Sequence, residues 1–219
     1  MPAGLKLPLF EDLDIVGGGY RDNAQCLVCG SMDRERLVYL YLKQRTSIFR
    51  IGGRVLHIAP EPLLMKSLQK QRNIQYIRAN ISQSRADVSF DVTQIPFKSD
   101  SFDLIIMNHV LEHVHDDKKA MSEILRVLKP KKGFCILQVP IGNALSQTIY
   151  DPSVSSDEER LSRYGQEDHV RLYGQDYPDL LSKAGFKADV FDWRSDKAKF
   201  SKYNKYGLIE GEKLFVGYK

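Results

Sequence analysis

Residues 101–140 read SFDLIIMNHVLEHVHDDKKAMSEILRVLKPKKGFCILQVP. Residues 102–107 and 134–139 are apolar runs, each too dense for a strand with one face in water, so each predicts a strand buried on both faces. A helix is predicted between them from Asp116 and Asp117, because short acidic side chains cap the free amides of a first turn. Two buried strands joined by a helix predict a right-handed βαβ unit with parallel strands.

The loop after the first of these strands, residues 108–115, is a candidate ligand site. In open parallel sheets, ligands bind at the carboxyl ends of the strands, and this loop begins at such an end. It is polar and holds three of the five histidines. We therefore expect the chemistry of the protein at this edge of the sheet.

The rest of the chain predicts five further strands, at residues 54–59, 74–79, 88–92, 187–193 and 213–218. The last two have no helix of adequate length between them, so we expect them to pair antiparallel. The prediction is an α/β, Rossmann-like fold: a seven-stranded, mostly parallel sheet with helices on both faces.

We expect two parts along the chain. Residues 1–50 form an N-terminal segment that is largely irregular but includes a helix over residues 34–45, and residues 51–219 form the main domain. Residues 141–173 read as a lid-like insertion, since the long polar connection within them is typical of a functional lid or a disordered excursion.

Composition limits the classes of function. No run of about 18 apolar residues occurs, so no membrane span is expected. The net charge of +4 is mild and does not favour nucleic acid, which usually needs a concentrated basic stripe. Three cysteines do not make a paired disulfide framework, so we expect a cytoplasmic protein, as a monomer or homodimer.

Two motifs now point to a family. The string DVTQIPFKSDSFDLIIMNHVLEHVHDDKKAMSEILRVLKPKKG and the later string DHVRLYGQDYPDLLSKAGF resemble class I S-adenosylmethionine-dependent methyltransferases of the type 11 group. The resemblance covers residues 54–218 in family order and spacing. It implies the strand order 3-2-1-4-5-7-6, S-adenosylmethionine as cofactor with S-adenosylhomocysteine as product, and a small-molecule or sugar-like methyl acceptor.

The resemblance also implies the cofactor site, with departures from the usual motif. His57 stands where the family usually has an acidic residue, and Ala59 and Glu61 stand where it has glycines. Asn80 replaces the acidic residue that usually holds the ribose. The implied cofactor-binding residues are His57, Ala59, Pro60, Glu61, Asn80, Asp91, Val92, Asn108 and His109.

The acceptor is expected between residues 108–115 and the insertion. His169 is the candidate catalytic base, because it follows the predicted lid and Asp168 beside it raises its basicity. The residues expected to line the acceptor site are His113, Arg163, Tyr164, Arg171 and Tyr173. No metal site is expected there. Cys26 and Cys29 have the spacing of half a zinc ribbon, but structural zinc needs four ligands.

Two alternatives stay open. The altered first motif and Asn80 also fit a binding or scaffold protein that keeps the fold without catalysis. An RNA methyltransferase is the other alternative, guided by the cysteine pair and by the basic residues of the first helix, Arg34, Arg36, Lys43 and Arg45. A steep loss of RNA affinity with salt would support it.

Overall fold

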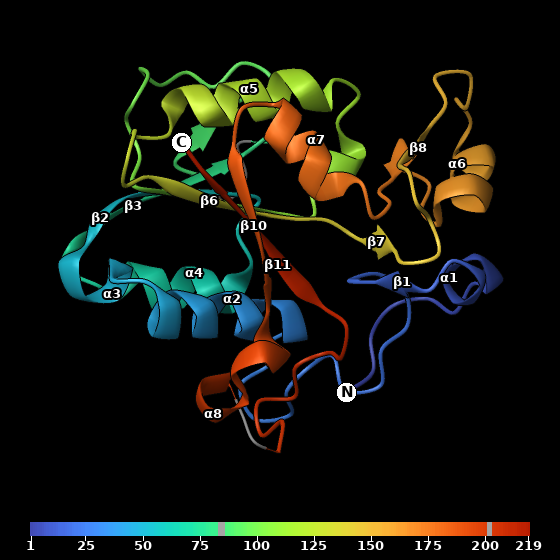
Figure 1. Ribbon diagram of the computed structural model, residues 1–219, viewed down its shortest axis with the longest axis horizontal. Coiled ribbons are helices and arrows are strands. Elements are labelled where there is room, and N and C mark those ends of the chain that lie inside the picture. The colour runs from blue at the N-terminus through green and yellow to red at the C-terminus, as the bar shows by residue number, and fades with distance from the viewer. Residues whose placement is uncertain (83–85, 201–202) are drawn as a thin grey trace.

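The computed structural model describes residues 1–82, 86–200 and 203–219, and it is organised around a seven-stranded sheet (Figure 1). The strand order is β10-β11-β6-β5-β2-β3-β4. The bounds are β2 Gly53–Ile58, β3 Ile74–Asn80, β4 Val88–Ser89, β5 Leu104–Asn108, β6 Phe134–Gln138, β10 Lys187–Asp192 and β11 Lys213–Tyr218. This confirms the predicted order 3-2-1-4-5-7-6.

The pairing within the sheet also matches the prediction. β5 is parallel to both neighbours, with Ile106 opposite His57 of β2 and opposite Ile136 of β6. β11 is antiparallel to β6 and to β10. All five residues of β5 are buried, as expected for a central strand covered on both faces.

Helices cover both faces of the sheet. On one face, α5 (Asp117–Val127) and α7 (Tyr177–Lys183) pack Ile124 and Leu181 into a core with Ile105 of β5. On the other, α2 (Asp33–Arg45) and α4 (Pro62–Gln69) pack against Ile106 of the same strand. Alternate residues of β5 thus belong to two separate cores, one on each face of the sheet.

Local signals explain where these helices begin. Asp116 is the N-cap of α5, and its Oδ1 accepts a hydrogen bond from the amide of Lys119 at 2.9 Å, as predicted. Pro62 lies in the first turn of α4, where its missing N–H costs no hydrogen bond. The predicted strand at 88–92 is shorter than expected, because Asp91 begins a side-chain-capped turn with Thr93.

The N-terminal segment and the insertion meet beyond the carboxyl ends of the central strands. β1 (Ile15–Val16) pairs antiparallel with β7 (Ile141–Gly142), and α1 (Pro8–Asp12) lies beside α6 (Asp157–Tyr164) (Figure 1). The remaining short elements are α3 Ile48–Ile51, η1 Leu111–His113, β8 Ile149–Tyr150, β9 Arg171–Leu172, η2 Trp193–Asp196 and α8 Lys197–Phe200. α2 packs into the core of the main sheet. The predicted division of the chain into an N-terminal segment and a main domain at residue 50 stays a prediction.

No helix in the described parts of the chain is long and apolar enough to cross a membrane.

Candidate functional site

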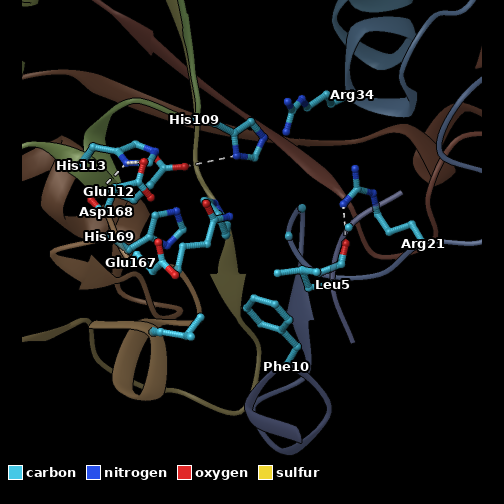
Figure 2. A pocket seen from close by; sticks show the side chains of 18 of the residues that line it. Leu5, Phe10, Arg21, Arg34, His109, Glu112, His113, Glu167, Asp168 and His169 are labelled. Atoms are coloured by element: carbon cyan, nitrogen blue, oxygen red, sulfur yellow. Dashed lines mark hydrogen bonds and ion pairs between the residues drawn. The ribbon is translucent and has the colours of Figure 1, made fainter. Parts of the chain in front are cut away.

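Two cavities lie at the carboxyl ends of the central strands. The first, which we call the sheet-end cavity, has a volume of about 750 Å³ and is lined by residues that end or follow β2, β3, β4 and β5. The second, which we call the outer cavity, has a volume of about 830 Å³ and lies between the N-terminal segment, the loop after β5 and residues 161–169 (Figure 2). His109, His113 and Asp168 line both cavities, so the two spaces adjoin.

The sheet-end cavity holds five of the nine residues predicted for cofactor binding. Ala59, Asn80, Asp91, Val92 and His109 line it. The Oδ1 atom of Asp91 accepts hydrogen bonds from the amide and hydroxyl of Thr93, at 2.8 and 2.7 Å, which fixes the orientation of the carboxylate. Sequence reasoning thus identified side chains from four different strands that share one cavity.

His57, Pro60, Glu61 and Asn108 line neither cavity. His57 is fully buried, and its ring nitrogens contact Tyr76 Oη at 2.8 Å and Glu61 Oε2 at 3.0 Å. The amide of Asn108 donates to Glu61 Oε1 at 3.0 Å. His57 thus holds Glu61 in place, and no atom of its ring reaches the surface.

This arrangement sets the charge of Glu61. Burial alone would raise its pKa, but the hydrogen bond and charge of His57, with the hydrogen bond from Asn108, lower the pKa below its ordinary value. Glu61 is therefore an ionised carboxylate immediately beyond β2.

Two residues at the strand ends have left-handed backbone conformations. Ala59 follows β2 with a φ of 50°, and His109 follows β5 with a φ of 54°. β2 and β5 are adjacent and parallel, so these two turns lie side by side at the edge of the sheet. Such conformations are uncommon outside glycine and persist where the surrounding structure imposes them, often at functional sites.

A cluster of histidine and carboxylate side chains forms the wall where the cavities meet (Figure 2). The Nδ1 atom of His109 lies 3.3 Å from Glu112 Oε1. The rings of His113 and His169 meet edge to face with centroids 4.7 Å apart. Burial lowers the pKa of His169 below its ordinary value, and the charge of Glu112 opposes that shift only in part.

Similarities to known proteins agree with a site at this edge of the sheet. Residues 43–137 match the family model described as "Methyltransferase domain". This match agrees with the resemblance of the sequence to type 11 methyltransferases. The chain is 29% identical over 131 residues to the 2-phytyl-1,4-naphtoquinone methyltransferase of Nostoc sp. (strain PCC 7120), with 59% of this chain and 52% of the relative covered. The chain thus spans about half the length of that curated relative.

Solved structures share the fold at low identity. A SAM-dependent methyltransferase from Archaeoglobus fulgidus has a TM-score of 0.52 at 14% identity, covering 84% of this chain and 94% of its own. The [4+2]-cyclase SpnF has a TM-score of 0.60 at 17% identity, covering 97% and 92%. These likenesses support the Rossmann-like fold of the chain, and a fold alone does not fix the reaction.

Four residues predicted to line the acceptor site lie elsewhere. The Arg163 side chain is 50% exposed and faces Asp151 at 3.4 Å. Arg171 is buried, forms an ion pair with Asp117 at 2.5 Å and donates to the carbonyls of Val114 and His115. These contacts link the end of the insertion to α5 and to the loop before it.

The two tyrosines predicted for the acceptor site are also buried in internal contacts. Tyr173 is fully buried, and its hydroxyl donates to Asp117 Oδ2 at 2.8 Å. Tyr164 is also fully buried, with its hydroxyl 3.1 Å from the amide of Asp151. His113 and His169, in contrast, line the outer cavity.

Sequence reasoning missed the contribution of the N-terminal segment. Leu5, Phe10, Arg21 and Arg34 line the outer cavity together with the backbone of Gly17, Gly18 and Gly19. Arg21 is paired with Asp33 at 2.7 Å, whereas the Nε atom of Arg34 is buried with no partner within the described residues. The run of three glycines was the available signal, since glycine permits close approach of backbone to a ligand.

The cysteine pair lies away from these cavities. Cys29 is exposed, and hydrogen bonds from the amides of Cys29 and Val28 lower the pKa of Cys26 to about 7. Among the residues that the structure describes, no set of three or more metal-ligating side chains includes either thiol.

Proposed function

We propose that this chain transfers a methyl group from S-adenosylmethionine to a small-molecule acceptor. The observation that carries the proposal is the sharing of His109 and His113 by two adjoining cavities. A cofactor in the sheet-end cavity would have one neighbour of the right size for an acceptor, because the outer cavity has the volume typical of a small-molecule site.

The side chains at the strand ends suit the parts of the cofactor. Asp91 would accept from the adenine amine, and the amide of Val92 would donate to the ring. Asn80 would bind the ribose hydroxyls, with the weaker bonds of a neutral amide. The methionine part would extend from the sheet-end cavity past His109 toward the outer cavity. Arg34 would provide a cation for its carboxylate there, and ionised Glu61, behind the lining, would attract its ammonium.

Methyl transfer from a sulfonium requires few catalytic groups, because the leaving group is already activated. The acceptor nucleophile forms a bond to the methyl carbon as the carbon–sulfur bond breaks, and S-adenosylhomocysteine leaves with the electron pair. Alignment of the nucleophile and exclusion of water are the main requirements. A hydroxyl acceptor also has to lose its proton, and we expect His169, on the cavity wall, to accept it.

The outer cavity favours a polar, hydroxylated acceptor. Its wall carries Arg21, Arg34, Glu112 and Glu167 beside the apolar Leu5 and Phe10. A quinone-type molecule, the class named in the printed name of the Nostoc relative, and a sugar-like molecule both fit this mixture of polar and apolar contacts. The mild net charge gives no support to RNA as the acceptor.

A pair of variants tests the two-cavity assignment. Leu161→Trp adds bulk to the outer cavity alone, so we expect unchanged affinity for S-adenosylmethionine but loss of S-adenosylhomocysteine formation on a panel of quinols and sugars. Asp91→Ala should weaken cofactor binding instead. The matched control is Glu158→Trp on the same helix, an exposed position that does not line the cavity. Cofactor binding without turnover in the wild-type protein would favour the non-catalytic alternative.

A further inference from the structure

Glu112, His113 and His169 form a compact set of metal-ligating side chains on the wall of the outer cavity. One ligand atom from each lies within 4.8 Å of the others. Two of the residues belong to η1, and the third is joined to it because the amide of Val170 donates to the carbonyl of Glu112 at 2.9 Å. The set is thus built from the loop after β5 and the end of the insertion, and it opens on the cavity (Figure 2).

The buried atoms of this set lack partners. Glu112 is 1% exposed and His169 is 2% exposed. Within the described parts of the chain, Glu112 Oε2 and His169 Nδ1 make no hydrogen bond. A buried carboxylate oxygen or ring nitrogen without a partner is costly, which calls for a ligand that is not part of the polypeptide.

Neighbouring residues orient two of the three side chains, His113 and Glu112, as in known metal sites. His113 Nδ1 lies 3.2 Å from the carbonyl oxygen of Asp168 and 3.2 Å from its Oδ2. A ring that donates from Nδ1 to a carbonyl or carboxylate presents the lone pair of Nε2, and metal-bound histidines almost always have such a partner. Glu112 is oriented likewise, because its Oε1 faces His109 Nδ1 at 3.3 Å.

The charge of the set also suits a cation. Glu112 supplies the one carboxylate of the set, and the imidazoles of His113 and His169 would bind a metal ion through neutral ring nitrogens.

We propose that Glu112, His113 and His169 bind one divalent transition-metal ion and present it to the outer cavity. Two imidazoles and one carboxylate are a ligand set that zinc and other first-row ions accept, and three protein ligands leave a position open. Ligand atoms sit about 2.0–2.2 Å from zinc, so small side-chain rotations would draw the three groups closer around the ion.

This inference rests on the proposed function only for the role of the ion. A divalent ion lowers the pKa of a hydroxyl bound to it, so the acceptor would lose its proton to water before its oxygen attacks the methyl carbon. His169 would then act as a ligand in place of the base predicted from the sequence. The acceptor class becomes one with two neighbouring oxygen atoms, such as a catechol or a vicinal diol, because such molecules chelate an ion.

The test measures metal binding alone, without cofactor or acceptor. Chelator-stripped full-length protein is titrated with Zn²⁺ by calorimetry and with Co²⁺ by visible absorption, in a Cys26→Ser/Cys29→Ser background so that the thiols do not contribute. We expect one ion per chain. His169→Ala and Glu112→Gln should each weaken binding by more than the roughly 10- to 100-fold that loss of an outer partner costs. The control His115→Ala, an exposed histidine outside the set, should bind as tightly as the background.

The outcomes separate the two proposals. Absence of binding up to millimolar metal, or full affinity in folded His169→Ala protein, overturns the metal site and leaves the cofactor site unaffected. Metal binding without any affinity for S-adenosylmethionine would instead contradict the proposed function. Thermal unfolding of each variant shows whether it is folded. If Glu112→Gln does not fold, His113→Ala replaces it in the test, with the same expected loss of metal affinity.

Discussion

The side-chain amide of Asn108, the last residue of β5, donates a hydrogen bond to Glu61 Oε1 at 3.0 Å, just beyond the neighbouring strand β2. His57 contacts the other oxygen of the same carboxylate. The usual acidic residue and glycines of the first motif are thus replaced by a charged residue that two neighbours hold in place.

Glu61→Gln should weaken the binding of S-adenosylmethionine. Removing a charge-assisted interaction with the ammonium costs about 1.5–3 kcal/mol, which corresponds to roughly 10- to 100-fold in affinity. Calorimetric titration measures this. Tyr76→Phe is the control, since it removes the hydroxyl that contacts His57 and leaves the carboxylate of Glu61 in place. Equal affinity in Glu61→Gln and wild-type protein would limit Glu61 to a structural role.

Arg34→Met should reduce affinity for S-adenosylmethionine but not for its decarboxylated analogue, if the guanidinium binds the cofactor carboxylate. The physical reason is that Arg34 lines the outer cavity without an ion-pair partner in the described chain and lies near enough to Glu61 to lower its pKa. The control is Lys43→Met on the same helix. An equal loss for both ligands would show that Arg34 acts on packing and not on the carboxylate.

Arg171→Met should destabilise the fold, whereas Arg163→Met should not. Arg171 and Asp117 form a buried ion pair, and removing one partner leaves a buried charge, at a cost of about 3–5 kcal/mol in the free energy of unfolding. Exposed pairs such as Arg163 with Asp151 contribute about 0–1 kcal/mol. Chemical denaturation of both variants measures the difference, and similar midpoints for the two would refute the structural assignment of Arg171.

Glu212→Gln should stabilise the protein at pH 8 and have little effect near pH 4. Burial, then the charge of Asp33, raises the pKa of Glu212 from 4.5 to about 7, while His109, Arg21 and Arg34 oppose that shift. Between these values the folded state binds a proton that the unfolded state lacks, so this group's contribution to stability falls as pH rises to about 7 and is then constant.

The expected gain at pH 8 is about 3 kcal/mol, from 1.36 kcal/mol for each unit of pKa shift. The measurement is the difference in unfolding free energy between wild type and variant at several pH values, which removes the titration of the other groups. A constant difference from pH 4 to pH 8 would contradict the raised pKa.

The sequence predicted most of what depends on local patterns. Apolar runs located the central strands, and the residues just after strand ends, such as Asn80 and Asp91, share a cavity because parallel strands end at one edge. Arg171 could not be assigned this way, since its partner Asp117 is 54 residues away in the chain and only packing brings them together.

The N-terminal segment was unpredictable for a related reason. Arg34 reaches the outer cavity because α2 packs into the core of the main sheet. The segment before α2 is joined to the insertion by β1 and β7, which pair across more than a hundred residues and are too short, at two residues each, to show a periodicity. The cluster of Glu112, His113 and His169 likewise depends on a fold of the insertion that the polar composition of residues 141–170 did not reveal.

Calorimetric titration of the purified chain with S-adenosylmethionine and S-adenosylhomocysteine is the decisive test of the proposed cofactor site. We expect micromolar binding of both, weakened at least tenfold in Asp91→Ala and unchanged in Asp100→Ala, which removes a carboxylate that pairs with Lys219 away from the cavity. Absence of binding up to millimolar ligand would contradict it.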